Sequence, residues 1–216
     1  MKMKYLSNLL LISTIGLIFT ACQKEIEFQD LNDPGGGNTG GVNGELVDDW
    51  NFIGLRAITN TAVTVTDAGQ EVKAVAFSDY VTENNVGTLK VTDNQFIFSG
   101  IGHTVNDEVN IKLYLNGLLL DDADSAFNYT TPPSDNTIDY VRNSNDSLTF
   151  TNAIFTLPDP AGGGSAPAGP MGARISISGD TLYVTVKNSL DTTISQGGAP
   201  ANLNAQYEST MRFTRQ

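Results

Sequence analysis

The sequence predicts an all-β protein, and three observations carry that prediction. Threonine, valine, isoleucine, phenylalanine and tyrosine recur in short runs, and these residue types favour strands. Glycine, asparagine and aspartate separate the runs, as turn residues do. Helical periodicity is hard to find after Cys22. With 17% charged and 40% hydrophobic residues, the composition is that of a folded exported chain rather than a disordered one.

The start of the chain has the layout of an export signal. Lys2 and Lys4 give it a positive charge, and a mainly apolar run follows over residues 5–19. The run is short for a membrane span, and Thr20-Ala21 supplies the small residues of a cleavage site. We therefore expect residues 1–21 to be a signal peptide, the alternative being an uncleaved N-terminal anchor.

Cys22, the single cysteine of the chain, comes directly after this signal. The stretch Phe19-Thr20-Ala21-Cys22 resembles the lipobox of bacterial lipoproteins, in which the cysteine is lipidated and becomes the first mature residue. The resemblance implies that a lipid anchor on Cys22 holds the protein at a membrane. Gln23 is not the aspartate of an inner-membrane retention signal, so the resemblance implies the outer membrane, with the domain facing the periplasm or the cell surface.

Residues 22–44 predict a flexible tether. The sequence turns polar after Cys22 and is then rich in glycine at Gly35-Gly36-Gly37 and Gly40-Gly41. A glycine-rich coil of roughly twenty residues has a root-mean-square reach of about 25 Å. The remaining residues, 45–216, are expected to form a single all-β domain, because their number is typical of one domain.

Two strands are expected at the start of this domain, which opens near Glu45. Residues 50–58 carry apolar side chains on both faces, and this pattern predicts a strand that is buried on both sides. A second strand is predicted over residues 72–81, after a turn at Gly69.

Two hairpins with favourable turn residues follow. Residues 87–92 and 95–99 flank Asp93-Asn94, and both of these residue types tolerate the positive φ of a tight turn. Apolar residues alternate over residues 108–120, where Asn116-Gly117 is the favoured pair of a type I′ turn.

The middle of the chain is predicted to be less regular. The acidic run Asp121 to Asp124 leads into an expected loop at Pro132-Pro133, because proline is a poor strand residue. Strand character returns over residues 137–141 and 147–151. Residues 158–170, rich in glycine and proline, are predicted to form a long loop.

The last three strands alternate regularly. Residues 174–178 and 181–186 are joined by a turn at Gly179-Asp180, and Leu182 is expected to face inward. Residues 205–215 form the predicted closing strand. Successive strands joined by tight turns predict an up-and-down antiparallel meander.

A meander with this many strands must curl or split, and closure into a barrel removes the exposed edges. Residues 45–216 begin with a tryptophan strand and end with an arginine-bearing strand, and in this they resemble the lipocalin-like domains of secreted bacterial lipoproteins. The resemblance implies a lipocalin-like barrel in which Trp50 packs against Arg212, or alternatively Arg215, at the closed end. Such a cation–π contact contributes about 0.5 to 2 kcal/mol. A β-sandwich would show similar alternation and is the alternative fold.

The candidate catalytic residues are few, and we expect a protein that is not an enzyme. His103 is the only histidine, so a catalytic triad or a histidine-based metal site would depend on it alone. Its neighbours Gly102 and Thr104 predict a turn. We expect no metal site and no cofactor.

Three hydroxyl side chains are candidates for O-glycosylation. Ser125, Ser147 and Thr181 each follow an aspartate and precede an apolar residue. These tripeptides resemble the sites that some bacteria glycosylate in the periplasm. A hairpin turn that leads into a strand explains the same pattern at Ser147 and Thr181.

The net charge of −12 limits the partners. Removing residues 1–21, which hold Lys2 and Lys4 and no acidic residue, would make it −14, and such a surface repels nucleic acid. The lipocalin-like resemblance implies that a small apolar or amphipathic ligand binds in the barrel. The aromatic residues that could line a ligand cavity or a sugar platform are Tyr80, Tyr114, Phe127, Tyr129 and Tyr140, although core packing or cross-strand pairing explains most of them. A barrel filled with side chains would leave a structural role instead. The alternative function is a surface module, built on a β-sandwich, that binds glycans or a partner protein.

Overall fold

The computed structural model describes residues 46–154, 169–196 and 199–216. The predicted signal peptide (residues 1–21), the lipidation site Cys22, the tether (residues 22–44) and most of the predicted loop at residues 158–170 lie outside these ranges. The described residues contain no helix, and so none that could cross a membrane. They form nine strands: β1 (Asp49–Asp67), β2 (Gln70–Val81), β3 (Glu83–Val91), β4 (Gln95–Leu115), β5 (Leu118–Arg142), β6 (Ser147–Phe150), β7 (Met171–Ser178), β8 (Thr181–Gln196) and β9 (Ala199–Arg215).

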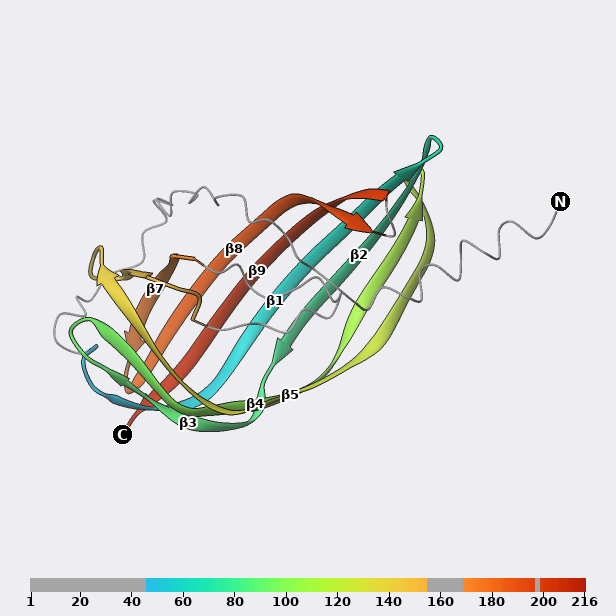
Figure 1. Ribbon diagram of the computed structural model, residues 1–216. Helices are drawn as coiled ribbons and strands as arrows, with labels where there is room; N and C mark the ends of the chain where they lie inside the picture. Colours follow the sequence, from blue (N-terminus) through green and yellow to red (C-terminus); the bar gives the residue numbers. More distant parts are fainter. Residues whose placement is uncertain (1–45, 155–168, 197–198) are drawn as a thin grey trace.

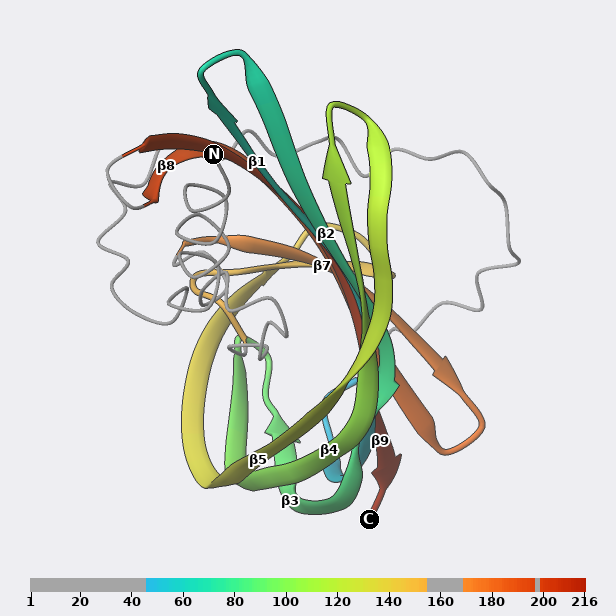
Figure 2. The ribbon, with the colours of Figure 1, turned by 90° about the vertical axis from the view of Figure 1, so that its right-hand side faces the viewer.

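The nine strands form one antiparallel sheet that closes on itself (Figure 1). Closure comes from β1 and β9, which pair from Trp50↔Arg215 to Val65↔Ala201. Figure 2 shows the hairpins β1–β2 and β4–β5 projecting beyond the ring. The structure confirms the predicted all-β meander and its closure into a barrel, and a single continuous ring contradicts the β-sandwich alternative.

Strands β2 and β3 follow each other in the same position of the sheet. Both pair with β1 on one side and with β4 on the other. The break between them lies at Thr82, whose amide donates to the Leu55 carbonyl over 2.9 Å, while its Oγ1 accepts the Leu55 amide over 2.8 Å. The hydroxyl thus replaces a backbone acceptor. Because β2 and β3 share one position between β1 and β4, the barrel has eight strand positions around its circumference.

Strand β1 is buried on one face only, so the prediction of burial on both faces was wrong. The register shifts between Phe52 and Gly54, as in a β-bulge. Trp50 and Phe52 before the bulge and Leu55 after it therefore all face the barrel interior, whereas Ile53 is 40% exposed. The extra residue at the bulge shifts the alternation of inward-facing and outward-facing residues by one position. Without knowledge of the bulge, the apolar residues of β1 therefore seem to lie on both faces.

Strand β5 runs through the loop that was predicted at Pro132-Pro133. It pairs with β4 along its length, but β6 covers only Tyr140 to Arg142. In the described part of the chain the prolines thus lie on an unpaired edge, next to register shifts around Ile101↔Ser134. A proline costs no ladder hydrogen bond at such a position.

Aromatic side chains fill the barrel at the end where β1 begins. The ring centroids of Phe96 and Phe150 lie 5.0 Å apart, and those of Phe52 and Phe213 lie 5.5 Å apart. These separations are typical of stabilising aromatic pairs. Trp50 is fully buried and its indole N–H donates to the Leu46 carbonyl over 3.2 Å. This end of the barrel is a packed core.

The arginine that packs on Trp50 is Arg215, so the predicted pair of Trp50 with Arg212 was wrong and the alternative is correct. The Arg215 guanidinium carbon lies 5.1 Å from the Trp50 ring centroid, and its Nε lies 2.9 Å from Asp48 Oδ2. The register explains the choice, because Trp50 pairs with Arg215 across the closure while Arg212 pairs with Gly54 beyond the bulge.

Candidate functional site

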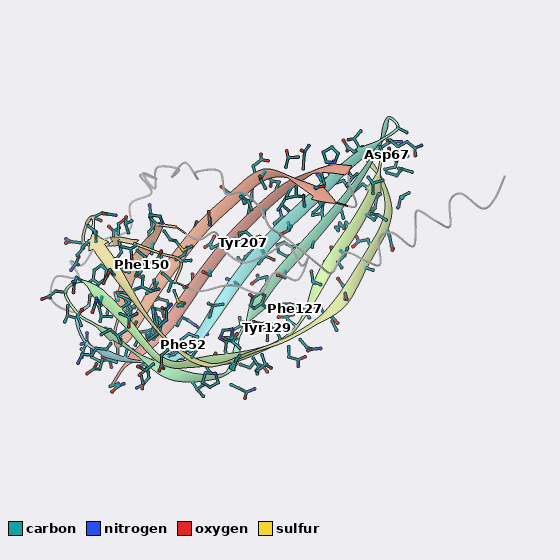
Figure 3. All side chains as sticks on the ribbon, in the orientation of Figure 1. Phe52, Asp67, Phe127, Tyr129, Phe150 and Tyr207 are labelled. Atoms are coloured by element: carbon teal, nitrogen blue, oxygen red, sulfur yellow. The ribbon has the colours of Figure 1, made fainter. Side chains whose placement is uncertain are left out.

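A cavity of about 280 Å³ lies next to the packed end of the barrel. Strands β1, β4 and β5 supply most of its lining, and Figure 3 places Phe52 and Tyr129 in this part of the molecule. The lining residues are Phe52, Leu55, Phe98, Ile101, His103, Tyr129, Thr131, Ser134, Asp135, Asn136 and Ile154. The volume is just below the usual range of ligand pockets, about 300 to 1,000 Å³.

The lining is apolar on the β1 side and polar along β5. Phe52, Leu55 and Ile101 are buried and present hydrocarbon to the cavity. On β5, Asp135 uses Oδ1 to accept the Gly100 amide over 2.7 Å. The lining residues include this one carboxylate and neither lysine nor arginine. Such a surface suits a molecule with an apolar body and a polar group.

His103 is the most enclosed polar group of the lining, with 9% of its surface exposed. Its Nε2 lies 3.1 Å from Thr131 Oγ1, and its ring centroid lies 6.2 Å from that of Phe52. Its Nδ1 is buried and has no hydrogen-bond partner within the described residues. A buried polar atom without a partner costs about 1 to 3 kcal/mol, and a hydrogen bond from another molecule to this nitrogen would offset that cost.

The predicted turn around His103 was wrong, because Gly102 to Thr104 lie inside strand β4. Gly102 has a different purpose there. A Cβ on this residue would lie 3.0 Å from the Pro133 nitrogen, so glycine allows β4 and β5 to approach each other closely. This approach brings Thr131 to His103.

Burial lowers the pKa of His103 from its ordinary value of 6.5, and a lower pKa favours the neutral imidazole. A neutral ring carries one donor and one acceptor nitrogen. If Nε2 donates to Thr131, Nδ1 accepts; if Nε2 accepts from Thr131, Nδ1 donates. A hydroxyl group satisfies Nδ1 in either case, because it can both donate and accept.

The stability of the protein is expected to fall as the pH drops below about 6.5. The unfolded chain protonates His103 more readily than the folded chain, because burial lowers the folded-state pKa. The contribution is thus complete above the unfolded pKa and is lost as the pH falls toward the folded one. Since His103 is the only histidine, His103→Asn should flatten the dependence of Tm on pH between about 7.5 and 5.5. Equal slopes for both proteins would contradict this assignment.

The three candidate glycosylation residues lie on different strands. Ser147 begins β6 and Thr181 begins β8, each directly after a turn, as the turn explanation requires. Ser125 lies inside β5, opposite Val109, and is exposed. Glycosylation of these residues stays a prediction.

The acidic run Asp121 to Asp124 belongs to β5. Asp122 accepts a hydrogen bond from Asn110 Nδ2 over 2.8 Å and lies 3.4 Å from Lys112 Nζ. The Asn110 hydrogen bond is the main reason that the pKa of Asp122 is lowered, with a smaller effect from Lys112. Within residues 46–154, 169–196 and 199–216, no group of three histidine, cysteine or acidic side chains is placed to hold a metal ion.

The sequence pointed to part of the cavity. Of the five candidate aromatic residues, Tyr129 lines the cavity, whereas Tyr114 does not. Tyr80 and Phe127 pack against each other with ring centroids 5.6 Å apart, and Tyr140 packs against Phe96 with ring centroids 5.2 Å apart. Thr131 was missed because it falls next to the predicted loop. Its signal was the alternation of Phe127, Tyr129 and Thr131, which continues strand β5 up to the prolines.

Comparison with known proteins gives no assignment, since no protein-family model matches this sequence and no curated protein matches it.

Proposed function

We propose that this protein is a non-enzymatic, exported lipoprotein whose barrel binds a small amphipathic ligand beside His103. The observation that carries the proposal is the cavity of about 280 Å³, whose lining includes His103, a residue with a buried Nδ1 that has no partner within the described residues. A ligand that bonds to this nitrogen would remove the cost of an unpaired buried polar atom. The hydrocarbon of Phe52 and Leu55 would add the hydrophobic contribution.

The packed end of the barrel limits what the cavity can hold. Phe96, Phe150 and Phe213 occupy the interior near the start of β1. A ligand therefore has to enter from the side of the long hairpins, and the part of it that reaches His103 has to be small. The barrel is neither empty nor completely filled, and this supports a binding role over a purely structural one.

The proposed location rests on the sequence. The lipobox-like stretch ending at Cys22 and the glycine-rich tether that follows favour a lipid-anchored domain at the outer membrane, facing the periplasm or the cell surface. The binding of glycans or a partner protein was tied to a β-sandwich, and the closed ring of strands removes that basis. Ligand binding in the cavity is the function that we put forward.

Binding of 1-hexanol to the mature protein tests the proposal. We expect saturable binding by calorimetry, weakened about tenfold in His103→Phe, because one hydrogen bond to a buried group is worth about 1 kcal/mol or more. The matched control is Asn106→Phe, which makes the same kind of change at an exposed position of β4 and should bind as the wild type does.

Native mass spectrometry of protein purified from its own host provides the second test. A mass above that of polypeptide plus lipid, lost on mild unfolding, is the expected result. Replacing Cys22 by serine should remove the lipid mass and leave the ligand mass. A wild type that neither binds 1-hexanol nor retains a small molecule would refute ligand binding.

A further inference from the structure

Strand β8 has a free backbone edge along its second half. Its pairing with β7 ends at Ala173↔Val186, whereas its pairing with β9 continues to Gln196↔Ala199. Within the described residues, no strand other than β9 pairs with β8 beyond Val186. Figure 1 shows β8 continuing beside β9 past the end of β7. We call residues 187–196 of β8 the free edge.

The odd-numbered residues of β8 direct their backbone groups toward this open side. The Asp180 carbonyl, directly before β8, accepts the amide of Arg215 of β9 over 2.8 Å. Backbone groups point alternately to the two sides of an antiparallel strand, and the register of β8 with β9 has no shift. Even-numbered residues therefore bond to β9, and odd-numbered residues face the side without a described strand. In the free edge these are Lys187, Ser189, Asp191, Thr193 and Ser195.

The open edge on the other side of the sheet, on β5, is protected against strand pairing. Strand β6 pairs only with residues Tyr140 to Arg142 of β5. The rest of β5 carries exposed acidic residues and two prolines, both of which are usual protections of an exposed edge. These residues include Asp121, Asp122, Asp124, Pro132 and Pro133.

The free edge of β8 lacks such protection. It contains no proline and only two charged residues, Lys187 and Asp191. The Lys187 Nζ lies 3.1 Å from Glu208 Oε2 of β9, so an acidic group of the same sheet already pairs with it. Most of the other residues are threonine, serine and isoleucine, and β-branched residues favour strands. An uncharged edge of this kind is a template for a further strand.

The free edge is complementary to a second copy of itself. Leu190, Thr192 and Ile194 continue the inward-facing row of Val184 and Val186, and these three side chains are half-buried. An antiparallel pair with a two-fold axis at Thr192 places Leu190 of each copy opposite Ile194 of the other. The odd-numbered backbone groups of both copies then face one another, as a hydrogen-bonded ladder requires.

Neighbouring registers are less favourable. A two-fold axis at Asp191 would place this carboxylate directly opposite its equivalent, and like charges in that position are destabilising. An axis at Thr193 would move Leu190 and Ile194 out of opposition. With the axis at Thr192, Asp191 lies opposite Thr193 and the apolar pair is kept. A shift that places inward-facing residues opposite outward-facing ones would break the match of the two sheet faces.

We propose that this protein forms a two-fold symmetric dimer in which the free edges of two copies pair antiparallel, with Thr192 at the axis. The interface is isologous, so it closes after two copies. Ser189 pairs with Ser195 and Asp191 with Thr193, and each such pair exchanges both of its backbone hydrogen bonds. The lining of the cavity beside His103 includes no residue of β8, so the dimer and the proposed ligand site are independent of each other.

Sedimentation velocity of the mature chain carrying Cys22→Ser tests this proposal without the lipid. The mass should rise with concentration from that of a monomer to that of a dimer and no further. Thr193→Pro should weaken the dimer about thirtyfold, or about 2 kcal/mol, because each dimer loses two edge hydrogen bonds while the bonds to β9 remain. The matched control is Thr193→Ala, which keeps the amide and should form dimers as the parent chain does.

Cysteine substitution tests the register and does not depend on the folding of the proline variant. In the Cys22→Ser chain, Thr192→Cys places two Cα atoms about 4.5 Å apart at the axis, a separation that a disulfide spans. Oxidation should therefore yield a covalent dimer. Ser195→Cys is the control, because this exposed residue and its equivalent lie about 20 Å apart in the proposed register.

Four results would overturn the dimer. A chain that stays monomeric at all concentrations would show that the free edge does not pair with a second copy. Dimers that Thr193→Pro leaves intact, or equal cross-linking through Thr192→Cys and Ser195→Cys, would place the contact elsewhere. Assembly beyond the dimer would mean that β8 of one copy pairs with a different edge of the next, in an interface that does not close.

Discussion

Replacing Phe213 by alanine is expected to lower the free energy of unfolding by about 3 to 5 kcal/mol. Phe213 is 0% exposed and lies on β9, opposite Phe52 of β1, where the first and last strands close the barrel. Its ring centroid lies 5.5 Å from that of Phe52 and 6.4 Å from that of Phe98. The truncation removes hydrophobic contact and leaves a cavity at this closure, and the midpoint of urea unfolding measures the loss.

The control for this variant is Thr214→Ala at the next position of β9. Thr214 is only partly buried and points to the opposite face of the strand, so its loss should change the stability by about 0.5 kcal/mol or less. A cost below about 1 kcal/mol for Phe213→Ala would mean that the packing at the closure adjusts freely. The barrel would then be held mainly by its backbone hydrogen bonds.

The regular hairpins could be predicted from the sequence because their pattern depends only on neighbouring residues. Residues 174–186 alternate as expected around Gly179-Asp180, and Leu182 and Val184 are fully buried. The Asn116-Gly117 turn likewise joins β4 to β5, with both residues at positive φ. Where one strand is followed directly by its partner, turn chemistry and alternation are enough.

The predictions that failed depended on contacts between distant parts of the chain. Pro132 and Pro133 fit a strand because β6 ends before it reaches them, and nothing in their local sequence shows where β6 ends. The bulge at Phe52 to Gly54 inverts the alternation of β1, and only the pairing with β9 reveals it. Local patterns therefore predicted the fold class, while the register stayed undetermined.

The candidate site was predictable to the same extent. His103 was noted as the only histidine, but its neighbours Gly102 and Thr104 predicted a turn and therefore a structural role. The close approach of Pro133 to Gly102 explains the glycine, and that approach is a property of the folded sheet.

Replacing Gly87 by alanine is expected to cost about 2 to 4 kcal/mol, of which backbone strain supplies about 1 to 3 kcal/mol. Gly87 has φ +105°, and a Cβ on it would lie 2.5 Å from the Gly100 carbonyl oxygen. The backbone of β4 has to move to admit the methyl group, because Gly87 lies at a register shift between β3 and β4. Urea unfolding measures the effect, as for Phe213→Ala.

Gly69→Ala separates the clash from the strain. Gly69 also has a positive φ, +79°, but a Cβ there would meet nothing within 4 Å, so its cost should be about 1 kcal/mol. Ile101, which follows Gly100, lines the cavity, so Gly87→Ala should also weaken 1-hexanol binding while Gly69→Ala should not. Equal costs for the two variants would mean that β4 moves aside without resistance, and the shape of the cavity wall would then not depend on Gly87.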